Sequence, residues 1–176
     1  MLKKRINVKF MATSAIIAAL YVALVTVLQM TSFGPVQVRV AEVLTVLPLF
    51  TPAAIPGIFI GCVIANSIGV ASGASPLGIL DILVGPTASL IAAFMTYYIG
   101  KLRRKNTVAG VLLATIPPVV INAFVVGAML SHVYAAPFWI MVGSVALGQL
   151  IACTVMGSLL SFTIITTKAE RVLYYK

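Results

Sequence analysis

Acidic residues are almost missing from this chain of 176 residues, which has three Asp and Glu together against twelve Lys and Arg. Charged residues make up 9% of the chain and hydrophobic residues 61%, whereas a typical soluble domain is about 25% charged. So few ionisable groups could not cover a soluble domain of this length without leaving large apolar patches in water. The composition therefore excludes an ordinary soluble globule and predicts a membrane protein.

Catalytic and metal-binding motifs are also missing. The sequence has no G-x-x-x-x-G-K-S/T loop for ATP, no H-E-x-x-H zinc motif and no G-x-S-x-G around any serine. An intramembrane serine hydrolase needs a Ser paired with a His, and His132 is the single histidine. Cys62 and Cys153 fall in apolar stretches, where small packing residues are the favoured interpretation. We therefore predict that the chain is not an enzyme and needs no metal or other cofactor.

The basic residues gather in three blocks between apolar stretches. They are Lys3, Lys4, Arg5 and Lys9; Lys101, Arg103, Arg104 and Lys105; and Lys168, Arg171 and Lys176. A net charge of +9 would suggest nucleic acid as the partner of a soluble protein, but such blocks are typical of the cytoplasmic segments of membrane proteins. We expect membrane lipid and no nucleic acid around this chain, with all three blocks on the cytoplasmic side.

Six apolar stretches are candidates for crossing a bilayer, which takes roughly 20 residues. They are residues 10–30, 36–50, 53–71, 78–100, 107–130 and 137–166. Four precede the middle basic block and two follow it, so both termini and this block share one side. The second stretch is the weakest, because Pro48 and Pro52 bound it. The fold prediction is an all-α membrane protein: one domain over residues 1–176, a bundle of six transmembrane helices with both termini cytoplasmic.

Two of these spans contain helix breakers. Gly85-Pro86 lies in the fourth span and Pro117-Pro118 in the fifth, and each proline removes a backbone donor. A simple kink is the favoured interpretation, and a break that lines a cavity is the alternative.

Charged side chains inside the spans are rare, and each Arg, Lys or Asp at the bilayer centre costs roughly 2.5 to 3.5 kcal/mol. Arg39, Glu42 and Asp81 are the three outside the basic ends, and the topology places all of them in the outer half of the membrane. Uncharged polar and aromatic residues follow the same bias, with Gln149 deeper: Gln37, Asn66, Asn122, His132, Tyr134 and Trp139. Polar groups from several helices at one depth predict a solute-binding cavity open to the exterior.

Each of these residues also has a structural interpretation. Arg39 and Glu42 are three residues apart on one helix face and could form an ion pair with each other. Asp81 has no basic neighbour on its own helix and depends on the helix N-terminus, water or a ligand. We therefore expect loss of Glu42 to damage both fold and binding, and loss of Asp81 to damage mainly binding. The asparagines are also typical of interhelical hydrogen bonds, and Tyr134 and Trp139 of an interfacial aromatic belt.

Several short motifs between residues 33 and 85 resemble those of a known protein family. The motifs are FGPVQVRVAE at 33–42, LTVLP at 44–48, AIPG at 54–57, Gly61, Ala65-Asn66, Asp81 and Gly85. This pattern is similar to the QueT family, whose members are substrate-binding S components of energy-coupling factor (ECF) transporters, assigned to queuosine precursors. The later spans match mainly in length and order.

The resemblance implies a subunit of a bacterial cell membrane that captures a 7-deazaguanine, such as the 7-cyano or 7-aminomethyl form, near the extracellular face. The implied partners are a transmembrane coupling subunit and two cytoplasmic ATPases, which agrees with the missing ATP loop. The candidate substrate-binding residues are Gln37, Arg39, Glu42, Asn66, Asp81, Asn122 and Trp139. A carboxylate can accept two parallel hydrogen bonds from the donor edge of the ring, the amides can serve its carbonyl and nitrogens, and Trp139 can stack.

The first span presents one face of small residues, because Ala15, Ala19 and Ala23 recur every fourth position. S components commonly dock on the coupling subunit through such a stripe, so the resemblance implies that these alanines bind that partner. Packing against another helix of the same chain is the alternative.

Three functions stay open after the sequence alone. The favoured one is the S component, either for a queuosine precursor or for another small heterocyclic vitamin. A stand-alone secondary transporter or drug exporter would need a coupling residue in the inner half or an internal repeat, and the sequence shows neither. A structural subunit without a ligand would leave the convergent polar residues unexplained.

Overall fold

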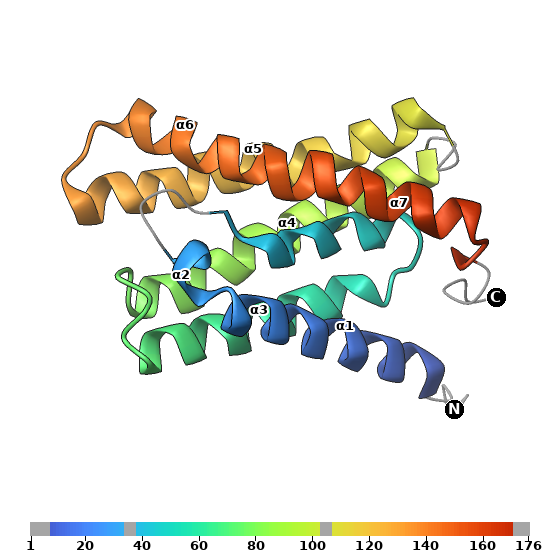
Figure 1. Ribbon diagram of the computed structural model, residues 1–176, viewed down its shortest axis with the longest axis horizontal. Coiled ribbons are helices and arrows are strands. Elements are labelled where there is room, and N and C mark those ends of the chain that lie inside the picture. The colour runs from blue at the N-terminus through green and yellow to red at the C-terminus, as the bar shows by residue number, and fades with distance from the viewer. Residues whose placement is uncertain (1–7, 34–37, 103–106, 171–176) are drawn as a thin grey trace, which may run out of the picture.

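The computed structural model describes residues 8–33, 38–102 and 107–170, and these ranges are helical, without a β-strand (Figure 1). The elements are α1 (Val8–Val27), α2 (Gln29–Ser32), the 3-10 helix η1 (Val40–Leu49), α3 (Ala54–Ala71), α4 (Ile79–Leu102), α5 (Val108–Tyr134), α6 (Phe138–Gln149), the π-helix η2 (Leu150–Met156) and α7 (Gly157–Thr166). The last three follow one another without a break as one long helical segment, Phe138–Thr166. The prediction of an all-helical membrane bundle is confirmed.

Within the described ranges, five helical segments are long and apolar enough to cross a membrane, namely α1, α3, α4, α5 and the segment Phe138–Thr166. The second predicted span differs. Its described helix, η1, has ten residues, and at about 2.0 Å per residue it is roughly 20 Å long, shorter than the hydrocarbon core of about 30 Å. A sixth crossing therefore stays a prediction. Helices α4 and α5 both continue past their prolines, so neither span is interrupted.

Helix η1 lies in the middle of the bundle, with the longer helices around it (Figure 1). Its residues from Ala41 to Leu49 are buried except for Val43. Two local features favour the tight 3-10 geometry: Pro48 has no N–H to donate, and the Thr45 hydroxyl donates to the carbonyl oxygen of Glu42 at 2.6 Å. Because η1 is enclosed by other helices, the side chains that it carries point into the protein and away from lipid.

Helices α1 and α3 approach each other closely because α3 has glycine at the contact. A Cβ atom on Gly57 would lie 2.8 Å from the carbonyl oxygen of Ser14, and one on Gly61 would lie 2.8 Å from Cβ of Tyr21. Such small-residue contacts are typical of membrane helix packing. The Ser14 hydroxyl adds a hydrogen bond of 2.8 Å to the carbonyl oxygen of Ala53. This contact brings Tyr21, which is fully buried, to the centre of the bundle.

The helix ends that adjoin the basic blocks lie at one end of the bundle (Figure 1). Helix α1 begins at this end, α4 ends and α5 begins there, and α7 ends there as well. The connections from α3 to α4 and from α5 to α6 lie at the opposite end. One basic end and one end without basic blocks are what a multi-pass protein with a single cytoplasmic face requires.

This arrangement predicts the outcome of cysteine labelling in intact cells. A Lys101→Cys variant at the basic end should react with a membrane-impermeant maleimide only after permeabilisation, whereas Pro76→Cys, between α3 and α4, should react from outside. Native Cys62 and Cys153 are 0% and 1% exposed and should give little background. Labelling of Lys101→Cys from outside would invert the topology.

Candidate functional site

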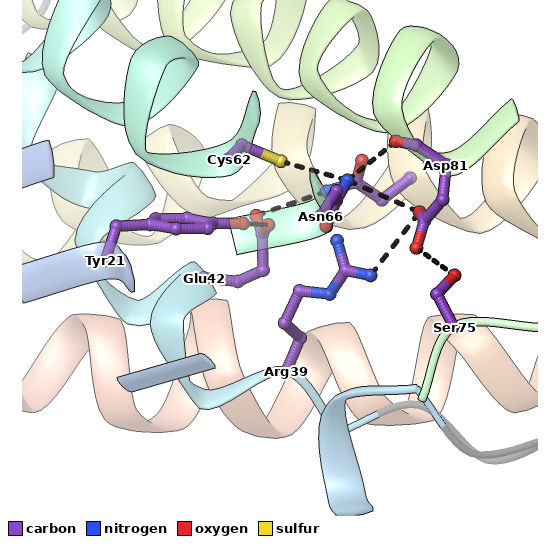
Figure 2. A network of polar contacts seen from close by, with 8 residues as sticks. Tyr21, Arg39, Glu42, Cys62, Asn66, Ser75 and Asp81 are labelled. Carbon is purple, nitrogen blue, oxygen red and sulfur yellow. Dashed lines mark hydrogen bonds and ion pairs between the residues drawn. The ribbon is translucent and has the colours of Figure 1, made fainter. Parts of the chain in front are cut away.

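Three charged side chains are buried together near the end of the bundle opposite the basic blocks. Arg39, Glu42 and Asp81 are 5%, 1% and 0% exposed. Figure 2 shows the Arg39 guanidinium reaching toward Asp81, with Asn66 above it and the Tyr21 hydroxyl at Glu42. We call the following residues the polar cluster: Tyr21, Arg39, Glu42, Asn66, Ser75, Asp81 and Asn122. They come from α1, α3, α4, α5, the start of η1 and the connection before α4, so only folding brings them together.

Asp81 is the ionic partner of Arg39. The Arg39 Nη2 atom lies 3.6 Å from Asp81 Oδ1, and the Ser75 hydroxyl donates to Asp81 Oδ2 at 2.8 Å. The Asn66 amide donates to the Asp81 backbone carbonyl at 2.7 Å, with a longer contact of 3.4 Å to Oδ1. The sequence suggested an Arg39–Glu42 pair and an Asp81 that depends on its helix N-terminus, water or a ligand. The structure corrects both, because α4 begins beside the start of η1 and Asp81 pairs with Arg39, a tertiary contact that residue spacing does not reveal.

Glu42 is held by uncharged donors instead. The Tyr21 hydroxyl donates to Glu42 Oε1 at 2.6 Å, and the Asn122 amide donates to Oε2 at 3.3 Å. Among the described residues, Glu42 takes part in no ion pair. A carboxylate can accept about four hydrogen bonds, so these two donors fix its orientation and leave it able to accept more.

Several buried polar atoms of the cluster have no hydrogen-bond partner in the described part of the chain. They are Arg39 Nε and Nη2, which are donors, and Asn66 Oδ1, which is an acceptor. The Phe33 ring covers one face of the guanidinium, with Arg39 Cζ 5.2 Å from the ring centroid. An unpaired buried polar group costs about 1 to 3 kcal/mol, and more when it is charged. A polar solute with an acceptor beside a donor would satisfy these atoms.

The structure brings five of the seven predicted substrate-binding residues together: Arg39, Glu42, Asn66, Asp81 and Asn122. The prediction that Trp139 joins this set is corrected, because Trp139 lies outside the cluster. It is 72% exposed and packs edge-on against Phe124 and Phe138, with ring centroids 6.4 and 5.0 Å away. Its position in the first turn of α6 turns the ring outward, as the aromatic-belt interpretation has it. Gln37 lies outside the described residues.

Residue-by-residue sequence reasoning missed Tyr21 and Ser75. A tyrosine in the middle of an apolar span was the available signal, because a buried tyrosine hydroxyl needs a partner. Ser75 lies in the connection before α4 and carried no signal of its own. In the described ranges, no three His, Cys, Asp or Glu side chains are grouped so that they could hold a metal ion.

The alanine stripe of α1 faces outward. Ala15, Ala19 and Ala23 are exposed, and they line an apolar groove of about 960 Å³ together with residues of α3 such as Ile60 and Ile64. The α1 face that packs inside the chain is a different one: its buried residues are Ser14, Ile17, Ala18, Tyr21 and Val25. Packing within the chain therefore does not account for the stripe.

Comparison with known proteins identifies one family. The family model described as QueT transporter matches residues 11–166, a range that contains both the polar cluster and the alanine stripe. Neither the curated proteins nor the solved structures contain a match to this chain.

The ion-pair geometry predicts opposite effects on stability from those expected from the sequence. Asp81→Asn leaves the buried Arg39 without a counter-charge, and breaking a buried pair in this way costs about 3 to 5 kcal/mol. Glu42→Gln removes no ion pair and keeps an oxygen that can accept from Tyr21, so it should lower the melting temperature less. Thermal unfolding of both variants in detergent measures the difference.

The double variant Arg39→Gln/Asp81→Asn serves as the control. It removes both charges of the pair and should recover part of the stability lost in Asp81→Asn. A larger drop in melting temperature for Glu42→Gln than for Asp81→Asn would show that Arg39 depends on Glu42 after all.

Proposed function

We propose that this chain, which belongs to the QueT transporter family, is the substrate-capture (S) subunit of an ECF-type importer in a bacterial cell membrane. Its substrate would be a queuosine precursor, bound in the polar cluster near the extracellular face. The observation that supports this proposal is the unpartnered set of buried polar atoms on Arg39 and Asn66. Buried polar groups at membrane depth are costly and mark binding sites for polar solutes.

The chemistry of the polar cluster suits a 7-deazaguanine. Its ring presents a carbonyl oxygen next to an N–H, which complement the Arg39 donors and the Asn66 acceptor. Its exocyclic amino group adds a further donor, which a carboxylate can accept. Hydrogen bonds to charged groups contribute about 1.5 to 3 kcal/mol each, so three of them, up to about 9 kcal/mol together, support submicromolar binding. A polyanionic substrate is disfavoured, because the cluster has two carboxylates and one arginine.

Docking of a separate coupling subunit would account for the exposed alanine stripe on α1. The chain has no ATP-binding loop, so the ATPases and the coupling subunit would be separate chains. The groove lined by Ala15, Ala19 and Ala23 is apolar and lies along α1 and α3. Small side chains there would let a helix of the coupling subunit approach closely.

Calorimetric titration of the purified chain alone in detergent tests the binding proposal. We expect submicromolar Kd values for the 7-cyano- or 7-aminomethyl-7-deazaguanine. Arg39→Gln/Asp81→Asn should weaken binding by about 100-fold, because it removes a charge-assisted contact of about 3 kcal/mol. Trp139→Ala, outside the polar cluster, is the matched control and should bind as the wild type does.

Two results of this titration would count against the proposal. Binding of guanine or of another heterocyclic vitamin in place of both deazaguanines would assign a different substrate. Binding that survives in the double variant would place the site elsewhere in the chain.

A bulky residue in the groove should separate capture from uptake. Ala19→Trp should leave the Kd of the isolated chain unchanged and abolish uptake of labelled substrate by cells that contain the coupling module, because the indole blocks close helix approach. Ala128→Trp places the same bulk on an exposed alanine of α5 away from the groove and should transport normally. Normal uptake by Ala19→Trp would move the docking face elsewhere.

A further inference from the structure

The two carboxylates of the polar cluster differ in how their charge is balanced. Asp81 has Arg39 as its counter-ion, and it also accepts hydrogen bonds from Ser75 and Asn66. Glu42 has Tyr21 and Asn122 as donors, and both are uncharged. One arginine against two carboxylates gives the cluster a formal charge of −1. Among the described residues, Glu42 is the carboxylate of the cluster that makes no ion pair.

A carboxylate without an ion-pair partner is costly inside a membrane bundle, because burial removes its hydration. Among the described basic residues, Lys9 and Lys101 lie at the start of α1 and the end of α4, two helix ends at the far end of the bundle (Figure 1). A ligand that brings one positive charge would balance Glu42 and make the occupied cluster neutral. A neutral ligand with the same ring would leave the charge in place.

From this asymmetry we infer that Glu42 is the specificity residue that recognises a positive charge on the ligand, and that Asp81 is a positioning residue for Arg39. The inference rests on the proposed function, because it assigns roles within the same site. A ligand ammonium group donates to the Glu42 carboxylate. The Arg39 Nε and Nη2 atoms, which make no hydrogen bond among the described residues, donate to an acceptor on the ligand ring, and Asn66 Oδ1 accepts from the neighbouring N–H.

The contacts of Asp81 fit a positioning role. Its Oδ2 atom is occupied by the Ser75 hydroxyl at 2.8 Å, and its Oδ1 atom faces Arg39 at 3.6 Å and Asn66 at 3.4 Å. These contacts hold the guanidinium beside the Phe33 ring. Asp81 therefore affects binding through Arg39, and a change in its contacts that keeps all charges should weaken a charged and a neutral ligand by the same factor.

A pair of probes that differ in charge tests the assignment. At neutral pH, 7-aminomethyl-7-deazaguanine carries an ammonium group, and 7-cyano-7-deazaguanine has the same ring without a charge. For the wild type, we expect the aminomethyl probe to bind about tenfold tighter or more, a difference of about 1.4 kcal/mol. Glu42→Gln should bring the ratio of the two Kd values close to one, mainly by weakening the aminomethyl probe. Glu42→Asp keeps the carboxylate and should retain the preference.

A variant on the Asp81 side that keeps every charge of the cluster provides the contrast. Ser75→Ala removes one hydrogen bond of Asp81 and keeps its ion pair with Arg39. It should weaken both probes by a common factor and leave the ratio of the two Kd values unchanged.

The outcomes separate this inference from the proposed function. Failure of the wild type to bind either probe would overturn the proposed function. Binding of both probes without a preference for the aminomethyl form would overturn the inference alone. So would a preference that survives Glu42→Gln, or a ratio that collapses in Ser75→Ala.

Discussion

The charged start of η1 has to be kept away from lipid, and this requirement accounts for much of the arrangement of the bundle. Arg39 and Glu42 lie three residues apart, one just before η1 and one in its first turn. Hydrocarbon offers neither of them a partner. The longer helices enclose η1 and provide these partners: Asp81 of α4 contacts Arg39, and Tyr21 of α1 and Asn122 of α5 contact Glu42. A short helix can be enclosed in this way more easily than one that spans the full bilayer.

Two helices with irregular geometry, η1 and η2, position the backbone of the polar cluster. The 3-10 helix η1 packs against the π-helix η2, and their contact includes the Thr45 hydroxyl, which lies 3.5 Å from Cys153 Sγ. The Cys153 thiol in turn donates to Gln149 Oε1 at 3.0 Å. Deviations from α-helical geometry of this kind are frequent at functional sites. Here the irregular helices position the backbone of Glu42, whose carbonyl oxygen accepts from Thr45. The position of the Glu42 carboxylate in the cluster follows from that of its backbone.

Helix α1 takes part in two surfaces with different chemistry. Its inner face holds Tyr21 against the Glu42 carboxylate, and close packing on Gly57 and Gly61 of α3 fixes that face. Its outer face carries the alanine stripe along an apolar groove. The proposed binding of a polar solute and the proposed docking of an apolar helix would thus use opposite sides of one helix. This arrangement lets substitutions at Ala19 be made without touching the polar cluster.

The sequence by itself determined the membrane setting, the five long helices to within a few residues, the end of the bundle that carries the basic blocks, and the identity of most polar residues in the cluster. These properties follow from local composition. A run of about 20 apolar residues is stable in lipid, and a charged side chain within such a run must contact other polar groups, whichever helices supply them. The tertiary structure alone decided the partners: Arg39 with Asp81, Glu42 with Tyr21 and Asn122, Trp139 outside the cluster, and η1 as a short central helix. Hydropathy and spacing report on one helix at a time, whereas an ion pair between residues 39 and 81 depends on which helix ends meet in space.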